Sequence, residues 1–385
     1  MQRVTLSGLI LLVGVPVAAA QAPAARDSPA VGAAAPESAS RQRVSVGYYA
    51  SFAGSPVDQI PWRRLTHVCH AYLRTDEAGE LVTDKAMPSR VLTDAAHARG
   101  VKVLLSLGGG RTSAGLERVT ADRPAITRYV TRVVKMVAEN GYDGVDIAWE
   151  FPRNRETRAG FVDLVAALRR ALDIQAQRRE RSEPFLLTAA VSPSGFFGKW
   201  IDVGAVIKRL DWLHVMTYDM AGPWSRTAGH HAPLFPSPAD PERGWRSVSI
   251  AMNYWHKDRG VPRQKLVLGI PLYGRAYPVT RRFAELDPEL RKQHGTLTFA
   301  QVRTLVGRGW PADWDDQSKA PWLQTPDGKR LIIAYDDRNS VDQKAKWAKA
   351  EGYLGLFFYA IHQDRMSDGT HWLIRAADRA WPLEK

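Results

Sequence analysis

The sequence predicts an α/β fold, a TIM (β/α)8 barrel with a small α+β insertion between its seventh and eighth strands. Short runs rich in β-branched and aromatic residues recur eight times along the chain, which is typical of buried strands. Between them lie stretches with apolar residues at three- and four-residue spacing, which is typical of amphipathic helices. Eight such strand and helix units in succession favour a closed parallel barrel.

The predicted elements follow one another in a regular order. The eight strands are expected at 44–49, 66–73, 101–107, 144–151, 185–191, 212–218, 266–272 and 354–361. The clearest helices are expected at 90–98, 123–139, 155–178 and 342–349.

The interval between the seventh and eighth strands is too long for one helix. Residues from about 278 to 336 carry a strand-like piece at 331–335 and a helical piece at 299–306, so we expect an α+β insertion there. Active sites of such barrels lie at the C-terminal ends of the strands, so the insertion should form one wall of a cleft.

The N-terminal region predicts export. Residues 1–20 combine one positive charge, a short apolar run and a final Ala18-Ala19-Ala20, the pattern of a cleavable secretory signal. The apolar run is too short to span a bilayer, for which about 20 residues are needed. Residues 21–42 are rich in Ala, Pro and Ser and predict a flexible leader before the barrel domain at 43–385. We therefore expect a secreted protein, extracellular or periplasmic, without a membrane span.

Composition limits the choice of partner. The net charge is +13, but the Lys and Arg residues are scattered and form no run, so we expect no nucleic-acid site. The single cysteine, Cys69, excludes an intrachain disulfide.

The fourth predicted strand carries two acids on one face. It reads Asp143-Gly144-Val145-Asp146-Ile147-Ala148-Trp149-Glu150, so alternation places Asp146, Ala148 and Glu150 on the same side. Inward-pointing acids at the end of a rigid strand are how a glycosidase mounts a general acid.

This strand resembles the signature of family 18 glycoside hydrolases, the chitinases and chitinase-like proteins, which reads Asp-Gly-x-Asp-x-Asp-x-Glu. Further segments resemble that family in the same order, so the resemblance covers about 44 to 365. They are 46–49, 106–109, 216–219, 222–224, 269–275, 314–316 and 335–337.

The resemblance implies a retaining hydrolysis of β-1,4-linked N-acetylglucosamine polymers. In that chemistry the acetamide oxygen of the substrate attacks the anomeric carbon, so the protein needs no nucleophile. Glu150 would be the general acid and base, which requires a raised pKa. Its other interpretation is a salt-bridged carboxylate at a strand end.

Ala148 departs from the family, which has an aspartate there to orient the acetamide and balance the oxazolinium charge. Losing one such group commonly costs about 10²–10³ in rate, so a slow enzyme is expected. Without a neighbouring negative charge the pKa of Glu150 should also be lower than in relatives.

Other site residues are carried over from the resemblance. Asp146, Tyr218 and Asp219 would assist catalysis, although Asp146 could also be a purely structural carboxylate. Arg275 could equally form a structural ion pair, Met216 could pack in the core, and both tryptophans could be packing residues. The residues expected to bind substrate are Tyr48, Met216, Trp224, Tyr273, Arg275, Trp322 and Tyr359.

No cofactor or metal is implied, because His230 and His231 lack a further ligand at suitable spacing. The expected partners are chitin or N-acetylglucosamine oligosaccharides, bound by a monomer. Two alternatives stay open: a non-catalytic chitin- or glycan-binding lectin, and a hydrolase of peptidoglycan or N-glycans.

Overall fold

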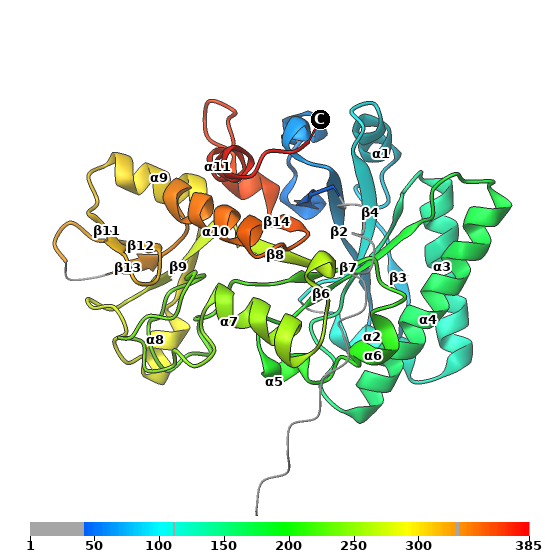
Figure 1. Cartoon of the computed structure of the whole chain (residues 1–385), viewed down its shortest axis with the longest axis horizontal. Coiled ribbons are helices and arrows are strands. Elements are labelled where there is room, and N and C mark those ends of the chain that lie inside the picture. The colour runs from blue at the N-terminus through cyan, green and yellow to red at the C-terminus, as the bar shows by residue number, and fades with distance from the viewer. Residues whose placement is uncertain (1–41, 111, 329–330, 385) are drawn as a thin grey trace, which may run out of the picture. The chain divides into compact units, whose positions relative to one another are not determined.

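Eight parallel strands close into a barrel at the centre of the molecule in a computed structural model (Figure 1). The structure describes residues 42–110, 112–328 and 331–384. Around the barrel the strands are β1 Val44–Ala50, β2 His67–Thr75, β4 Lys102–Gly108, β5 Gly144–Ala148, β6 Leu186–Val191, β7 Trp212–Val215, β8 Leu266–Pro271 and β14 Gly355–Tyr359. β1 pairs with both β14 and β2, which closes the ring, so the predicted TIM (β/α)8 barrel is confirmed.

Two apolar layers hold this barrel together. The outer layer joins the strands to the helices and contains Val145 and Ile147 of β5. A separate inner cluster contains Val46 of β1, Leu104 of β4 and Phe357 of β14. Because the strands are covered on both faces, their sequences are nearly continuous apolar runs, and polar side chains inside the barrel stand out.

The surrounding helices begin at polar capping residues. Ser89, Asp122, Asn154 and Asp337 each accept a hydrogen bond from a backbone N–H of the first turn, and the last two complete capping boxes. The helices are α1 Arg90–His97, α2 Ser113–Thr120, α3 Arg123–Glu139, α4 Arg155–Arg178, α5 Gly195–Gly198, α6 Val203–Val206, α7 Val248–Asn253, α8 Pro288–Lys292, α9 Phe299–Gly307, α10 Arg338–Ala350 and α11 Trp372–Ala380.

A second sheet of five antiparallel strands lies between β8 and β14 in the chain and to the left of the barrel in Figure 1. Its strand order is β10-β9-β13-β12-β11, and α8 and α9 accompany it. Its first strand follows β8 directly, so this sheet starts earlier than the predicted boundary at 278. Its strands are β9 Tyr273–Tyr277, β10 Gly295–Thr298, β11 Ala312–Asp315, β12 Ala320–Gln324 and β13 Ile332–Ala334; a short β3 Leu81–Val82 pairs with β2.

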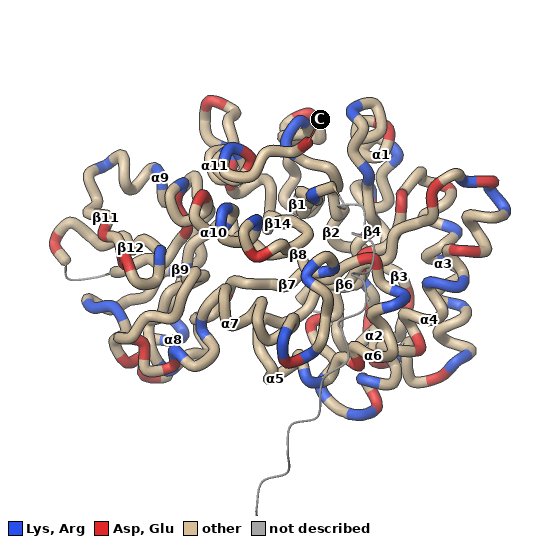
Figure 2. Tube along the Cα trace, in the orientation of Figure 1, with Lys and Arg blue, Asp and Glu red and all other residues tan. Residues whose placement is uncertain are grey.

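The predicted signal at 1–20 and nearly all of the predicted leader at 21–42 lie outside the described residues. Among the helices that the structure describes, none has the length and hydropathy needed to cross a bilayer. Lys and Arg positions are interspersed with Asp and Glu positions along the chain trace (Figure 2), in keeping with the scattered positive charge of the sequence.

Candidate active site

Glu150 lies just beyond the end of β5, where the C-terminal ends of the parallel strands gather. The Oγ of Ser113 donates to the Glu150 carbonyl oxygen at 2.5 Å, which fixes the backbone that carries the acid. The side chain is partly exposed, and its Oε2 lies 3.4 Å from the position of a Cβ on Gly110. A Cβ at residue 110 would therefore be in van der Waals contact with the carboxyl group.

Two glycines of β4 and its loop shape the floor beside this acid. Gly109 donates its N–H to the Ala148 carbonyl at 2.9 Å, and a Cβ on Gly108 would lie 2.4 Å from the same oxygen. Gly108 and Gly109 have φ of 115° and 89°, which L side chains rarely adopt. A Cβ on Gly109 would also meet the ring of Tyr72 at 2.7 Å. The glycine pair therefore brings β4, β5 and Tyr72 close together.

The carboxyl group of Glu150 has the electrostatics of an acid at neutral pH. Burial, followed by the negative charge of Asp219, raises its pKa to about 7. A carboxyl with this pKa is protonated in a large fraction of molecules near neutrality, as a general acid must be. Burial and Asp219 thus produce a raised pKa although residue 148 carries no charge.

Three phenols surround the same acid. The pKa values of Tyr72, Tyr218 and Tyr359 are all raised, first by burial, and the charge of Glu150 contributes to each. The rings of Tyr218 and Tyr359 are stacked, with centroids 6.1 Å apart and an interplanar angle of 24°. Tyr72 and Tyr359 also hydrogen-bond to one another, and these neutral phenols accompany the acid.

Asp219 is held by an arginine of the second sheet. Its Oδ1 accepts from Nε and Nη2 of Arg275 at 2.9 and 2.6 Å, while its backbone N–H donates to Nδ1 of His231 at 3.3 Å. Asp219 has a φ of 57°, an uncommon conformation for a residue other than glycine, which such side-chain bonds help to maintain. The ring of Tyr273 packs against His231 at 4.6 Å, so strand β9 and the loop after β7 form one polar wall.

Asp146 lies inside the barrel and is fully buried. Its oxygens accept from hydroxyls of Tyr48, Ser106 and Thr188 at 2.9, 2.7 and 2.7 Å, and Nδ1 of His214 lies 3.1 Å away. Burial alone would raise the pKa of Asp146, but these bonds outweigh it and lower the pKa. Asp146 is therefore a buried anion.

The hydrogen bonds also assign the tautomer of His214. The indole N–H of Trp212 can only donate, and it points to Nε2 of His214 at 2.8 Å, so the ring proton is on Nδ1 and faces Asp146. Cys69, Asp146 and His214 bring possible metal ligands within 4.8 Å of one another. Because protein donors already occupy the lone pairs of Asp146 and His214, the cluster fits a hydrogen-bond network better than a metal site.

The residues expected to bind substrate lie in three places. Tyr48, Tyr273, Tyr359 and Met216 belong to or pack against the inner cluster of the barrel near Glu150. Trp224 is 55% exposed, and the guanidinium of Arg275 lies 5.4 Å from its ring centroid.

Trp322 lies elsewhere. It is 3% exposed, packs with Tyr277 and Leu286, and donates its indole N–H to His230 at 3.0 Å. In this arrangement the ring is a packing residue of the second sheet, which was the other interpretation of this tryptophan, and it offers no open face to a sugar.

Sequence reasoning missed Tyr72 and His214. Tyr72 lies where the register between β2 and β4 shifts, so simple alternation could not assign its face. His214 lies between Leu213 and Val215 in an otherwise apolar strand. A single polar residue in such a strand could have identified it as a candidate for the barrel interior.

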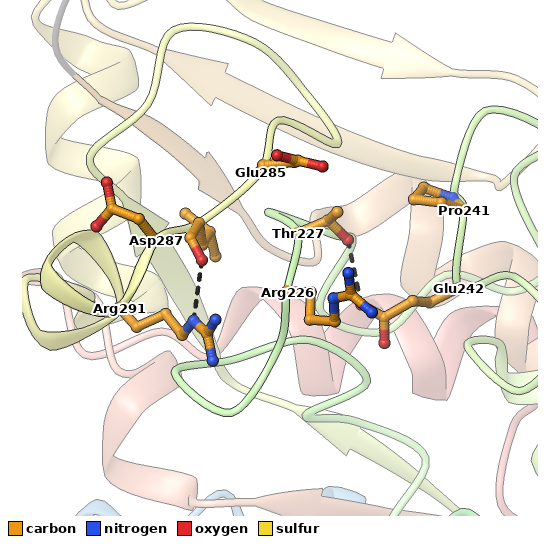
Figure 3. Close-up of a pocket in the computed structure, with 8 residues that line it drawn as sticks. Arg226, Thr227, Pro241, Glu242, Glu285, Asp287 and Arg291 are labelled. Atoms are coloured by element: carbon orange, nitrogen blue, oxygen red, sulfur yellow. Dashed lines mark hydrogen bonds between the residues drawn. The ribbon is translucent and has the colours of Figure 1, made fainter. Parts of the chain in front are cut away.

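A cavity of about 610 Å³ lies apart from Glu150, between the loop after β7 and the segment before α8 (Figure 3). Arg226, Arg291, Glu242 and Glu285 line it, and Nε of Arg291 donates to the Leu286 carbonyl at 2.9 Å. Its lining mixes both signs of charge and includes none of the expected site residues.

Residues 44–364 match the family described as glycosyl hydrolases family 18. Among curated proteins, an endochitinase of Manduca sexta is 28% identical, over 80% of this chain and 60% of its own length. Chitinase B of Serratia marcescens is 26% identical, over 85% of this chain and 78% of its own length. A class V chitinase from Nicotiana tobaccum, solved in complex with NAG4, superposes with a TM-score of 0.78 at 26% identity, covering 89% of this chain and 99% of that one.

Proposed function

The chain belongs to glycosyl hydrolase family 18, and we propose that it is a secreted hydrolase of β-1,4-linked N-acetylglucosamine polymers that acts with retention. The single observation that carries this proposal is Glu150, a partly exposed carboxyl at the strand ends with a pKa of about 7. A chitinase neighbour solved with NAG4 supports the substrate class.

In the proposed reaction the acetamide oxygen of the substrate attacks the anomeric carbon while Glu150 protonates the departing glycosidic oxygen. The resulting oxazolinium is then opened by water, from which Glu150 takes a proton. Tyr218 and Asp219 would contact the acetamide and its charge, since Asp219 is the carboxylate that acts on the pKa of Glu150. Asp146 would contribute indirectly, by holding the strand that carries the acid.

The sugar rings would lie against Tyr359 and Tyr273, with Trp224 as an outer platform because more than half of it is exposed. Arg275 would orient Asp219 through its two hydrogen bonds and keep Trp224 in place. We further propose that the protein is a monomer and that residues 1–20 are a cleaved export signal. Sequencing the N-terminus of the exported protein tests the cleavage.

Ala148 sets the expected rate. Its side chain is 1% exposed between Asp146 and Glu150, and a methyl group cannot accept a hydrogen bond from an acetamide N–H. Restoring the acid in Ala148→Asp should raise turnover on N-acetylglucosamine oligomers by about 10²-fold, following the usual effect of one preorganised electrostatic partner.

The test compares the purified protein with Glu150→Gln and Ala148→Asp in an oligomer cleavage assay with a sensitive product readout. Slow cleavage that Glu150→Gln abolishes supports the proposal. A background rate that neither substitution changes contradicts it.

A second candidate is a non-catalytic glycan-binding protein, which Ala148 favours. Calorimetry with the same oligomers separates the two, because tight binding without any product supports the binding protein. Product analysis on chitin, peptidoglycan and N-glycans decides between the proposed substrate and the other polymers.

A further inference from the structure

A basic cavity lies outside the barrel, beside helix α11. Its volume is about 480 Å³, and its lining comes from residues 58–64, from 365–371 and from Arg375 of α11. The first segment includes the short turns η2 Val57–Gln59 and η3 Trp62–Arg64, which precede β2. None of the residues given a role in the active site lines this cavity.

Positive charge outweighs negative charge in its lining. Arg64, Arg365 and Arg375 bring three guanidinium groups to it, against the single carboxylate of Asp58. Nε of Arg64 lies 3.8 Å from a carboxylate oxygen of Asp378, a long ion pair. In the described part of the chain, Arg365 and Arg375 make no ion pair within 4.0 Å.

Two polar atoms in this lining are buried without a partner. Nε of Arg365 and Nε2 of His371 have no hydrogen-bond partner among the described residues. His371 is 8% exposed, so its free nitrogen is not simply solvated from outside. Buried polar atoms without a partner are unusual and call for an occupant that satisfies them.

The electrostatics of His371 report the same imbalance. Burial, then the positive charges of Arg365 and Arg64, lowers the pKa of His371 to about 4. Asp368 also interacts with Arg365, but it is exposed and its Oδ1 accepts from the backbone N–H and hydroxyl of Thr370. The positive charge of the arginines at His371 is therefore not balanced by the nearby carboxylates.

We propose that this basic pocket, formed by Arg64, Arg365, His371 and Arg375, binds a phosphate-class oxyanion. The donors come from two parts of the chain, Arg64 and the stretch 365–375, and they line one cavity. The guanidinium fork matches the oxygens of a phosphate, and three such groups supply more positive charge than a single carboxylate needs. A cavity of about 480 Å³ exceeds the needs of a bare ion and leaves room for the group that carries it. The site is independent of the chemistry proposed for Glu150.

The test is calorimetric titration of the whole protein with inorganic phosphate at constant ionic strength. We expect saturable binding and a dissociation constant about tenfold larger in Arg375→Gln, which removes one charge-assisted contact of about 1.4 kcal/mol. Arg375 is exposed on α11, so this variant should fold. The matched control is Arg379→Gln, exposed on the same helix one turn later and outside the pocket, which should bind phosphate like the unmodified protein.

Absence of saturable binding would overturn the proposal, as would equal losses in Arg375→Gln and Arg379→Gln, which would indicate a diffuse surface effect. A parallel titration with glucose 6-phosphate identifies the source of the anion. Tighter binding of the ester supports an oxyanion carried on a larger ligand, and tighter binding of inorganic phosphate supports the free ion.

Discussion

Replacing Glu150 with glutamine should make the folded protein more stable at pH 8 and leave its stability unchanged at pH 4. The pKa of Glu150 rises from 4.5 to about 7 on folding. Below pH 4.5 the folded and unfolded chains are both protonated at this position. As the pH rises to 7 the unfolded chain ionises while the folded chain keeps its proton, so stability falls.

The size of the effect follows from the same numbers. A difference from 4.5 to about 7, at about 1.4 kcal/mol per pKa unit, corresponds to about 3 kcal/mol as an upper value. Glutamine has the same shape and does not titrate, so this penalty disappears in Glu150→Gln. Urea unfolding at pH 4, 6 and 8, followed by tryptophan fluorescence, measures the difference between the two proteins.

The difference in unfolding free energy between Glu150→Gln and the unmodified protein should grow between pH 4.5 and 7 and then remain constant. Asp146→Asn provides a control of opposite sign, because the pKa of Asp146 is lowered and its anion is satisfied by surrounding donors. That variant should lose about 2 kcal/mol or more at pH 7. Equal stability of Glu150→Gln and the unmodified protein at pH 8 would refute the reasoning about the acid.

Two further predictions concern neighbours of the acid. Asp219→Asn removes the charge that helps to raise the pKa of Glu150, so the alkaline limb of the kcat/KM profile should move to lower pH; an unmoved limb would show that burial acts alone. Gly108→Ala places a Cβ 2.4 Å from the Ala148 carbonyl at a φ of 115° and should cost about 3 kcal/mol or more in urea unfolding. The control Gly100→Ala, with a φ of 69° and open space, should cost about 1 kcal/mol, and equal losses would contradict the close approach.

The barrel could be predicted from the sequence because each of its strands is buried on both faces, which leaves a clear apolar run. The environments of the two candidate sugar-binding tryptophans could not be predicted from the sequence. Trp224 and Trp322 both follow a proline, and only tertiary packing makes one 55% exposed and the other 3% exposed. Tyr72 was hidden for a related reason, since the register shift in β2 breaks the alternation on which a face is assigned.

The acid pair was predictable in part. The alternation along β5 placed Asp146 and Glu150 on one side, but their opposite pKa shifts depend on partners far away in sequence. The hydroxyl of Tyr48 and the ring of His214 reach Asp146 from 98 and 68 residues away. No local sequence pattern predicts such long-range contacts.

The donors around Asp146 come from four other strands, β1, β4, β6 and β7. The hydrogen bonds of this one carboxylate therefore depend on the register of five of the eight barrel strands. A slip of one residue in any of them would turn its donor outward and leave the charge short of a partner. The buried anion thus favours correct folding, because only the native register of these strands supplies all of its hydrogen-bond donors.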